Sequence, residues 1–337
     1  MDPYRQVVLA ARPKGLPRRG DFRLETGPMP EPREGQVLVA TKFLSLDPYM
    51  RGRMNDAASY APPVDVGDVM EGEVVAEVVL SRHPSLIRGE LVLGRIGWRT
   101  HAAIAPRDLQ RVASGLNPPS TSLGVLGMPG FTAYAGLRAI GKPRPGETVV
   151  VSSAAGAVGS LVGQLAQLAG ARAVGIAGGA AKCAYVHDEL RFDAVVDHKA
   201  RGLSKALAAA CPDGIDVYFE NVGGPVWNAV LPLLNRYARV PVCGLIAHYN
   251  GSAPGEPNSI AEAMLAILRR SLLIRGFINT EFAPDLYRAF LSEITPLVRS
   301  GRIRYREHVV EGLEAAPQAF IGMLEGHNLG KTLVRVS

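Results

Sequence analysis

One short stretch of the sequence has the spacing of a turn that could hold a phosphate group. Ala154-Ala155-Gly156-Ala157-Val158-Gly159 follows the apolar run Val149-Val150-Val151. Glycine in such a turn lets the backbone approach a pyrophosphate, and the first amides of the next helix can bind its oxygens. Ala154 replaces the first glycine of the usual fingerprint, so the prediction depends on the strand–turn–helix setting. A tight turn in another kind of α/β protein is the alternative.

The glycines further along have an expected packing role. Gly159 and Gly163 lie in the first turns of the helix expected at 158–169, where the lack of a side chain would let that helix pack tightly on the sheet. We therefore expect a dinucleotide site at this turn, with the free amides of the first helical turn as its phosphate ligands.

The residues after the second strand bear on the choice between NAD and NADP. NAD-binding proteins usually carry Asp or Glu about 20 residues past the turn, where it binds the ribose hydroxyls. Here Ala177 is followed by Gly178-Gly179-Ala180-Ala181-Lys182, which contains no carboxylate. A cation at this place suits the 2′-phosphate of NADP. We predict NADP(H) as the cofactor, with Lys182 as a phosphate ligand; a solvated surface lysine is the alternative.

Metal chemistry and a second class of dehydrogenase are not expected. Residues 1–126 contain no cysteine and only His83 and His101, so a zinc ligand set is missing there. None of the ten tyrosines has a lysine four residues later, which excludes the Tyr-x-x-x-Lys pair of short-chain dehydrogenases. The cysteines, Cys183, Cys211 and Cys243, share no short spacing, and such sparse usage is typical of a reducing cytoplasm.

The elements that must position these residues alternate from about Met128 onward. Apolar runs of strand length are separated by segments of helical length, which predicts a doubly wound parallel sheet with helices on both faces. The expected strands are 147–152, 172–177, 193–197, 215–220, 239–244 and 271–277.

The first part of the chain, up to about Ala105, has short strand candidates at 36–41 and 72–79 and many prolines. The segment 330–336 is also typical of a strand and could rejoin that first domain. The 337 residues are enough for two domains.

The net charge and the hydropathy of the sequence limit which kinds of binding partner we expect. The net charge of +6, from 37 basic minus 31 acidic residues, is spread out, which argues against a nucleic-acid arm but allows a phosphate-bearing ligand. Apolar runs are too short for a spanning helix, and basic residues near the start argue against a signal peptide. We expect no membrane partner.

Five stretches in order along nearly the whole chain carry a family resemblance: 46–51, 127–134, 154–159, 219–224 and 326–332. Together they resemble the zinc-independent medium-chain dehydrogenase/reductases. Within these, the sequence is similar to the branch of prostaglandin/leukotriene reductases, alkenal double-bond reductases and curcumin reductase.

The resemblance implies a GroES-like β-barrel catalytic domain from residues 1–126 and 301–337, and a Rossmann NADP-binding domain over 127–300. It implies NADP(H) in the cleft between them and a homodimer, in which 272–277 could be a pairing edge strand. His198 stands where the family has a tyrosine beside the adenosine phosphate, and a histidine could still donate there. The implied cofactor-binding residues are Met128, Thr132, Gly156, Ala157, Val158, Gly159, Lys182, His198, Asn221, Cys243, Gly244, Tyr249, Phe277, Ile278, Asn279 and Asn328.

Hydride transfer without a metal needs a substrate that is already electrophilic, such as a conjugated enone or enal. Hydride added to the β-carbon leaves an enolate oxygen that needs a hydrogen-bond donor, and the α-carbon then needs a proton. Tyr249, after the strand ending at Gly244, is the first candidate donor, and Tyr49 is the second. For each, the alternative is a packing tyrosine without a proton role.

The expected activity is NADPH-dependent reduction of the carbon–carbon double bond of α,β-unsaturated ketones and aldehydes. NADPH:quinone reduction is a rival reaction on the same fold, and a non-catalytic NADPH-binding sensor is a rival of another class. The segments 55–63 and 252–260, rich in Pro, Ala and Ser, would line the substrate pocket.

Overall fold

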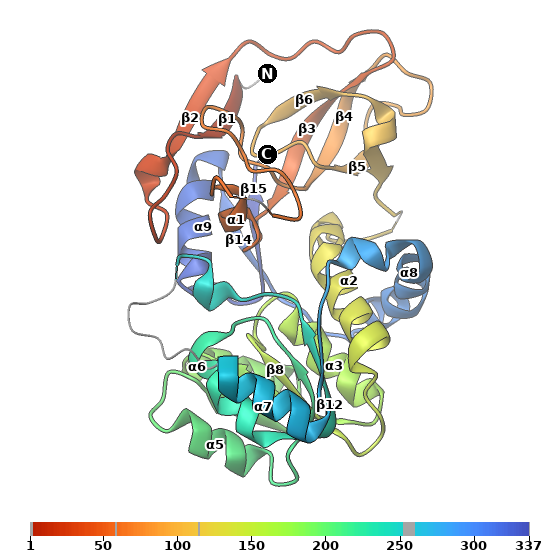
Figure 1. Ribbon diagram of the computed structural model, residues 1–337. Helices are drawn as coiled ribbons and strands as arrows, with labels where there is room; N and C mark the ends of the chain where they lie inside the picture. The colour runs from red at the N-terminus through yellow and green to blue at the C-terminus, as the bar shows by residue number, and fades with distance from the viewer. Residues whose placement is uncertain (1–2, 58, 114, 252–259, 337) are drawn as a thin grey trace. The chain divides into compact units, whose positions relative to one another are not determined.

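The computed structural model describes residues 3–57, 59–113, 115–251 and 260–336, which form two compact units (Figure 1). The first unit comprises Met1–Gly124 and Glu307–Ser337, and the second comprises Val125–Arg306. The boundaries expected from the sequence, at 127 and 300, are close to these ends. The function of each unit stays a prediction.

The second unit is built on a parallel sheet with the strand order β10-β9-β8-β11-β12-β13. All of β8 is buried, as is typical of a strand covered on both faces. The predicted doubly wound parallel sheet is confirmed. The strands are β8 (Thr148–Ser152), β9 (Arg172–Ala177), β10 (Ala194–Asp197), β11 (Ile215–Phe219), β12 (Leu234–Val242) and β13 (Leu273–Gly276).

Helices cover both faces of this sheet because strand side chains alternate in direction. Val150 and Tyr218 share one core with side chains of α5, α6 and α7. On the other face Phe219 contacts Phe277 and lies close to Gly136. The helices are α2 (Met128–Ala135), continued by the π-helical η4 (Gly136–Gly141), α3 (Gly159–Leu168), α4 (Ala180–Ala184), α5 (Leu203–Ala210), α6 (Gly224–Val230), α7 (Ile260–Arg270) and α8 (Ala283–Arg299).

Two strands differ from their expected bounds for local reasons. β12 begins at Leu234 and not at Arg239, because its first half carries exposed polar residues and a left-handed Tyr237 (φ 66°), so no apolar run marks it. β13 spans Leu273–Gly276 and not 271–277, since Ser271 has φ 51°, which an extended strand does not allow.

The first unit holds a mainly antiparallel sheet with the path β14-β15-β3-β4-β5-β7, in which β6 also pairs with β3. β15 lies antiparallel to β3, so the predicted return of the chain end to the first unit is confirmed. The strands of this sheet are β3 (Val37–Ser45), β4 (Val74–Ser81), β5 (Leu91–Gly94), β6 (His101–Ile104), β7 (Leu109–Arg111), β14 (Glu307–Glu311) and β15 (Lys331–Arg335). A separate antiparallel pair is formed by β1 (Tyr4–Leu9) and β2 (Phe22–Gly27), and the helices of the unit are α1 (Met50–Arg53) and α9 (Ala316–Leu324).

The core of the first unit is an aromatic cluster. Trp98 stacks on Phe22 with ring centroids 5.7 Å apart, and Phe320 of α9 meets Trp98 edge-on at 5.7 Å. All three side chains are buried. Because Phe320 comes from the end of the chain and Phe22 from its beginning, this cluster secures the return of the C-terminal segment.

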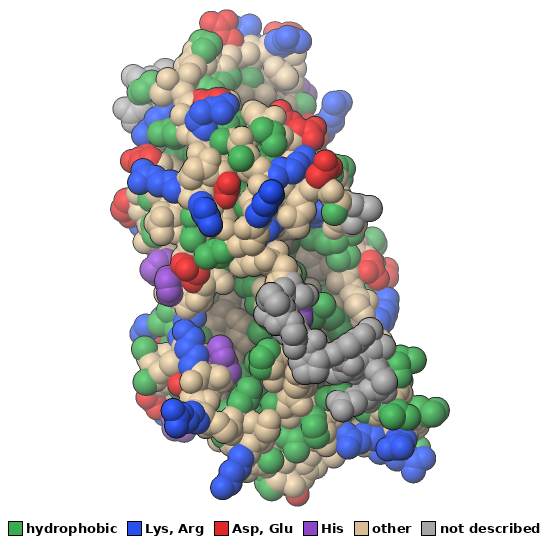
Figure 2. Space-filling view, turned by 60° about the vertical axis from the view of Figure 1, so that its left-hand side comes forward, with side chains coloured by type: hydrophobic (Ala, Val, Ile, Leu, Met, Phe, Trp, Pro, Cys, Tyr) green, Lys and Arg blue, Asp and Glu red, His purple; other side chains and the backbone are tan. Residues whose placement is uncertain are grey.

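Charged side chains of both signs are intermingled on the face shown in Figure 2. This agrees with the spread of the excess positive charge along the sequence. Within the ranges given above, the structure contains no helix that is both long and apolar enough to cross a membrane.

Candidate active site

The glycine turn joins β8 to α3, as the sequence predicts. Ser153, the first residue after β8, has a left-handed backbone (φ 54°), which residues other than glycine adopt infrequently. Ala154 is fully buried beside Gly175 of β9, where an added Cβ would lie 2.9 Å from the Ala154 Cβ. The alanine at the place of the usual first glycine is therefore accommodated by a glycine on the neighbouring strand.

Close packing after the turn depends on two further glycines. A Cβ on Gly159 would lie 2.3 Å from the Ser153 carbonyl oxygen, so only glycine allows α3 to begin there. A Cβ on Gly163 would lie 1.9 Å from the Phe192 ring. A Cβ on Gly175 of β9 would lie 3.1 Å from the same ring, so α3 and the sheet pack on each other through Phe192.

One amide of the turn is used within the turn. The Gly156 amide donates to the Ser153 carbonyl (2.9 Å), so it closes the turn itself. α3 begins at Gly159, after Ala157 and Val158, and the first amides of a helix have no partner within it. An anion placed here would be bound by helix-terminal donors.

Three basic side chains, Lys182, His198 and Lys199, gather beside the loop after β9; we call them the basic cluster. A Cβ on Gly178 would lie 2.6 Å from His198 Nε2 and 3.2 Å from Lys199 Cε. Burial lowers the pKa of Lys182, and the charge of Lys199 lowers it further. Burial also lowers the pKa of His198, which Asp197 opposes and both lysines reinforce. An anion would relieve this mutual repulsion.

Asp197, the last residue of β10, holds the loop beside the basic cluster. Its Oδ1 accepts the amides of Gly179 (2.8 Å) and Lys199 (2.9 Å). These two hydrogen bonds lower the pKa of the carboxyl group. The acid nearest the site therefore binds backbone amides of both loops and fixes their relative position.

Glu220 is a buried carboxylate directly after β11. Its exposed fraction is 1%, and its Oε1 is the acceptor of a group of neutral donors. The donors are the hydroxyls of Tyr218 (2.8 Å) and Ser152 (3.1 Å) and the amides of Val222 (2.7 Å) and Gly223 (3.0 Å). We call these four groups and the carboxylate the Glu220 network.

The backbone around Glu220 joins three strand ends at the carboxyl edge of the sheet. The Glu220 carbonyl accepts the amides of Cys243 (2.9 Å) and Gly244 (3.2 Å), which follow β12. Asn221 Nδ2 donates to the carbonyl of Ser152 (2.8 Å), the last residue of β8. The structure thus brings Asn221, Cys243 and Gly244 together, at the edge where ligands bind in open α/β sheets.

Tyr249 lies at the same edge. Its hydroxyl accepts the Leu245 amide at 3.4 Å. A Cβ on Gly244 would lie 2.9 Å from that hydroxyl, so the absence of a side chain at residue 244 allows the phenol to lie over the backbone. The phenol therefore sits beside Cys243 and Gly244, among the residues expected to line the cofactor.

A second group of candidate residues meets at α2. Thr132 Oγ1 donates to the Met128 carbonyl (2.7 Å) and accepts Asn279 Nδ2 (3.0 Å). Phe277 is buried against Phe219, so its ring is part of the core of the second unit. Ile278, which follows it, is partly exposed.

Tyr49, the second candidate donor, lies in the first unit, directly before α1. Its ring packs on that unit's hydrophobic core, with the Arg53 guanidinium 5.9 Å from the ring centroid. Burial raises the pKa of the phenol, and the charges of Asp47 and Glu71 raise it further. Tyr49 therefore remains protonated at neutral pH and can donate a hydrogen bond.

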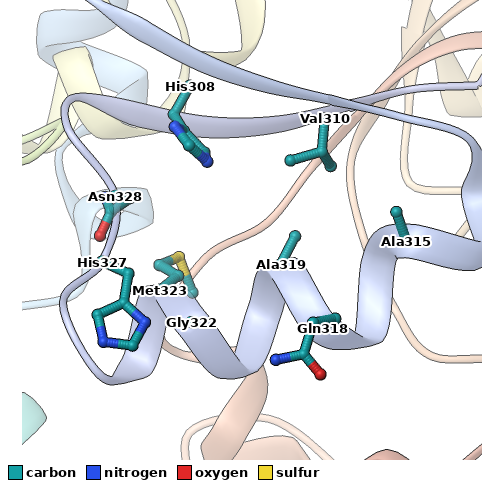
Figure 3. Close-up of a pocket in the computed structure, with 9 residues that line it drawn as sticks. All are labelled: His308, Val310, Ala315, Gln318, Ala319, Gly322, Met323, His327 and Asn328. Carbon is teal, nitrogen blue, oxygen red and sulfur yellow. The ribbon is translucent and has the colours of Figure 1, made fainter.

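Asn328 also lies in the first unit, where it lines a cavity of about 300 Å³ between β14 and α9. Figure 3 shows the imidazole of His308 on the β14 side of this cavity and that of His327 on the side of α9, with Asn328 between them. Asn328 Nδ2 donates to the Gly330 carbonyl (2.9 Å) and so stabilises the turn into β15.

The two segments expected to line a substrate pocket are described only in part. The segment 252–260 lies outside the described residues except where α7 begins, and 55–63 lacks residue 58. In the described part of 55–63, the Tyr60 ring lies 4.3 Å from the Arg53 guanidinium.

The chain matches known proteins along almost its whole length. Residues 5–112 match the N-terminal domain of oxidoreductase, and residues 157–295 match the zinc-binding dehydrogenase family. The sequence is 49% identical to the NADPH-dependent curcumin reductase of Escherichia coli (strain K12), over 99% of this chain and 97% of that protein. It is 40% identical to prostaglandin reductase 1 of Rattus norvegicus, over 96% of each chain.

Among solved structures, CurA from Vibrio vulnificus in complex with NADPH is similar, with 47% identity, a TM-score of 0.95 and 99% coverage of each chain. The chain belongs to the zinc-independent branch of the medium-chain dehydrogenase/reductases. The resemblance carried by the five sequence stretches is thereby confirmed, as are the Rossmann and GroES-like folds.

One of the two matching family models is named for zinc-binding dehydrogenases, so it matters whether metal-ligating side chains gather anywhere in this protein. In the part of the chain that the structure describes, no group of three or more His, Cys, Asp or Glu side chains could hold a metal ion.

The sequence analysis missed two residues of this site. Lys199 follows the third strand of the sheet closely and is one of only seven lysines, which is the signal that could have identified it. Glu220 lies within the matched stretch 219–224, directly after an apolar strand. A carboxylate at a strand's carboxyl end indicates a polar network there, but not which neighbours it binds.

Proposed function

We propose that this chain uses NADPH to reduce the carbon–carbon double bond of α,β-unsaturated ketones and aldehydes, without a metal. The basic cluster is the observation that carries the proposal. It combines Lys182, His198 and Lys199 beside a strand end that lacks a carboxylate. This arrangement favours a 2′-phosphate over a free ribose hydroxyl. The relatives named for NADPH and for reductase activity support the same conclusion.

The residues present fit a dinucleotide phosphate. In the proposal, the turn from Gly156 to Gly159 binds the pyrophosphate and the basic cluster binds the 2′-phosphate. The cofactor, when bound, supplies the hydride. The further proposed lining residues are Met128, Thr132, Asn221, Cys243, Gly244, Tyr249, Phe277, Ile278, Asn279 and Asn328.

The protein's own chemical task is to stabilise charge on the substrate oxygen. Reduction of an enone at its β-carbon moves an electron pair onto that oxygen, which a fixed hydrogen-bond donor stabilises. We assign this donor to the Tyr249 phenol, which lies at the carboxyl edge of the sheet. Tyr49 is the second choice, since burial keeps its phenol protonated.

The proposal also assigns the two units. The first, expected as residues 1–126 and 301–337, would be the GroES-like catalytic domain, and the second, expected as 127–300, the Rossmann NADP-binding domain. The turn, the basic cluster and the Glu220 network all belong to Val125–Arg306, which supports the cofactor role of the second unit.

The test compares the wild-type protein with Tyr249→Phe on 4-phenyl-3-buten-2-one. We expect the variant to lose about a hundredfold in kcat, the usual effect of removing one oxyanion donor. NADPH binding, measured by fluorescence titration, should change little. A matched control is Tyr237→Phe, because Tyr237 is an exposed tyrosine of the same unit.

The same assay separates the rival functions. Rapid consumption of a benzoquinone with no turnover of enones would contradict the proposal and favour quinone reduction. NADPH binding without turnover across a broad panel of activated alkenes would favour a sensor.

We also propose a homodimer that pairs through β13. β13 is an edge strand of the sheet, and an unpaired edge is a template for pairing with another chain. Leu273 on it is 51% exposed, and Met264, Leu265 and Leu268 of α7 are exposed as well. Analytical ultracentrifugation should show a dimer for the wild-type protein. The Leu273→Lys variant should dimerise more weakly.

A cytoplasmic setting is proposed from cysteine usage alone. Three widely spaced thiols are typical of proteins from a reducing compartment. Cys211 and Cys243 have raised pKa values because they are buried, about 11 and about 12, so neither is a reactive thiolate at neutral pH.

A further inference from the structure

Two of the five family stretches, 46–51 and 326–332, meet in the first unit. Lys331 is the first residue of β15, and its Nζ donates to Asp47 Oδ1 and to the Leu46 carbonyl, both at 2.7 Å. The Leu46 amide donates to the Thr332 carbonyl (3.2 Å). Residues almost 300 positions apart thus form one joint between the chain end and the segment after β3.

The joint is a buried ion pair. Asp47 is 5% exposed and Lys331 is 4% exposed. Ser45 Oγ donates to the other carboxylate oxygen of Asp47. Two charges removed from water are stable only when their geometry is good and their remaining hydrogen bonds are made, and loss of one partner is strongly unfavourable. The position of the Asp47 side chain is therefore closely defined by Lys331.

Asp47 also begins the turn that carries Tyr49. The Asp47 carbonyl accepts the Met50 amide (3.1 Å), and the Pro48 carbonyl accepts the Arg51 amide (3.1 Å). Tyr49 lies in the middle of this turn, so its phenol is placed by the same backbone that the ion pair anchors. Displacement of Asp47 would displace Tyr49.

We propose that Lys331 and Asp47 are a pair of positioning residues that hold the turn 47–50 and thereby aim the Tyr49 phenol at the substrate. The inference rests on the proposed function, in which Tyr49 contacts the substrate as a donor or pocket wall. Neither Lys331 nor Asp47 is assigned a contact with the reacting atoms.

The other charges around the pair explain why a cation is required. Burial raises the pKa of Glu73, and Asp47 adds to this, whereas Arg95 and Lys331 lower it. Burial also raises the pKa of Glu307, and Lys331 lowers it. Without Lys331, Asp47 would lie near the Glu73 carboxyl group and would lose the cation that its own carboxylate contacts.

The experiment replaces Lys331 by Met, which keeps the length of the side chain and removes its charge. The control is Lys42→Met, since Lys42 forms an ion pair with Glu77 (3.0 Å) in the same unit but both side chains are about one-third exposed. Amide hydrogen exchange is measured on a peptide covering 46–54 and on one covering β4. We expect Lys331→Met to lose protection at least tenfold in 46–54 and to keep it in β4.

Activity is measured in a double-mutant cycle with Tyr49→Ala, using 4-phenyl-3-buten-2-one. Lys331→Met should lower kcat/KM by about a hundredfold when Tyr49 is present, as expected for misplacement of a reacting group. In the Tyr49→Ala background the same substitution should lower it less than threefold. Equal losses in both backgrounds, or an unchanged kcat/KM in Tyr49→Ala alone, would overturn the positioning role.

The exchange measurement keeps this inference separate from the proposed function. If the wild type reduces no enone, the proposed function fails, while loss of protection in 46–54 would still support the anchor. Unchanged protection in Lys331→Met would overturn the anchor whatever the activity. If Lys331→Met does not fold, the double variant Asp47→Asn/Lys331→Met takes its place, because it leaves no buried unpaired charge. The same exchange and activity measurements then apply to the double variant.

Discussion

The two units each contain a buried carboxylate next to candidate site residues, and the two are stabilised differently. Asp47 in the first unit contacts a cation, with 2.7 Å between its Oδ1 and Lys331 Nζ. Glu220 in the second unit accepts hydrogen bonds at Oε1 from neutral hydroxyls and amides. One charge is balanced by an opposite charge, and the other by local dipoles.

The difference reflects where the partners come from in the chain. Ser152, Tyr218, Val222 and Gly223 lie on or beside two adjacent strands, so the sheet itself delivers donors to Glu220. Asp47 obtains its partner from the chain end, which first has to return beside β3. The ion pair joins residues far apart in the sequence and depends on one partner, so loss of that partner removes the whole interaction. The dipoles around Glu220 share the stabilisation among several groups.

The largest expected effect is from breaking the ion pair. Asp47→Ala leaves Lys331 buried without its carboxylate, which should lower the free energy of unfolding by about 3–5 kcal/mol. Urea unfolding followed by circular dichroism measures the loss. Asp47→Leu/Lys331→Met is the matched control and should recover most of it. A double variant as unstable as the single one would show that packing, not charge, is responsible.

A smaller loss is expected when the charge of Glu220 is removed. In Glu220→Gln the amide oxygen still accepts hydrogen bonds from some of the four donors. The free energy of unfolding should therefore fall by about 1–3 kcal/mol. Glu220→Leu, which offers no acceptor, should cost more. NADPH titration should weaken in both, because the loop 221–223 loses its anchor. A loss in Glu220→Gln equal to that in Asp47→Ala would contradict the contrast between dipoles and charge.

The pH dependence of stability gives a further test of the charges around Lys331, because Glu307 lies beside it. Burial raises the pKa of Glu307 in the folded protein, so between the unfolded and folded pKa values the folded state binds more protons. Its contribution to stability is therefore present at low pH and declines as pH rises through that window. Glu307→Gln should remove this decline, because the amide does not titrate. The readout is the wild-type-minus-variant difference in unfolding free energy from pH 4 to 7.

A difference that stays constant across this range would contradict the raised pKa of Glu307. Glu314→Gln is a suitable control, since Glu314 is exposed in its ion pair with Arg5.

The smallest expected effect concerns the basic cluster, where like charges lie together. The pKa of His198 is lowered, so the imidazole is mostly neutral at neutral pH and gains charge as pH falls below its ordinary range. The preference for NADP over NAD, measured as a ratio of Kd values, should rise a few-fold from pH 7.5 to 5.5. His198→Gln should show a flatter profile. An identical rise in the variant would assign the effect to the phosphate itself.

Much of the fold follows from local patterns. The run 149–151 predicted β8, and the alternation of apolar runs predicted the parallel sheet that the structure contains. β12 shows the limit, because Asn235 to Tyr237 are polar and carry no strand signal, and Arg236 and Tyr237 are exposed. They lie at a shift in the register between β11 and β12, whose paired residues are Leu234 and Arg239 on either side, so the strand is continued by its neighbour and not by their own residue types.

The candidate site divides in the same way. The glycine turn and Lys182 could be inferred because their chemistry depends on nearby residues in the sequence. Lys199 and Glu220 were missed, since their importance depends on distances to side chains from other strands. The neighbour of Gly163 could not be inferred for the same reason, since Phe192 lies 29 positions away in the chain.

The sequence by itself therefore determined the cofactor class, the turn and the family, because these depend on residue types at short spacing. Only the tertiary structure decided that Ala154 is compensated by Gly175, that His198 and Lys199 lie against Gly178, and that Lys331 meets Asp47. The physical reason is that steric fit and the balance of buried charge are properties of atoms a few ångströms apart, and chain folding alone brings those atoms together.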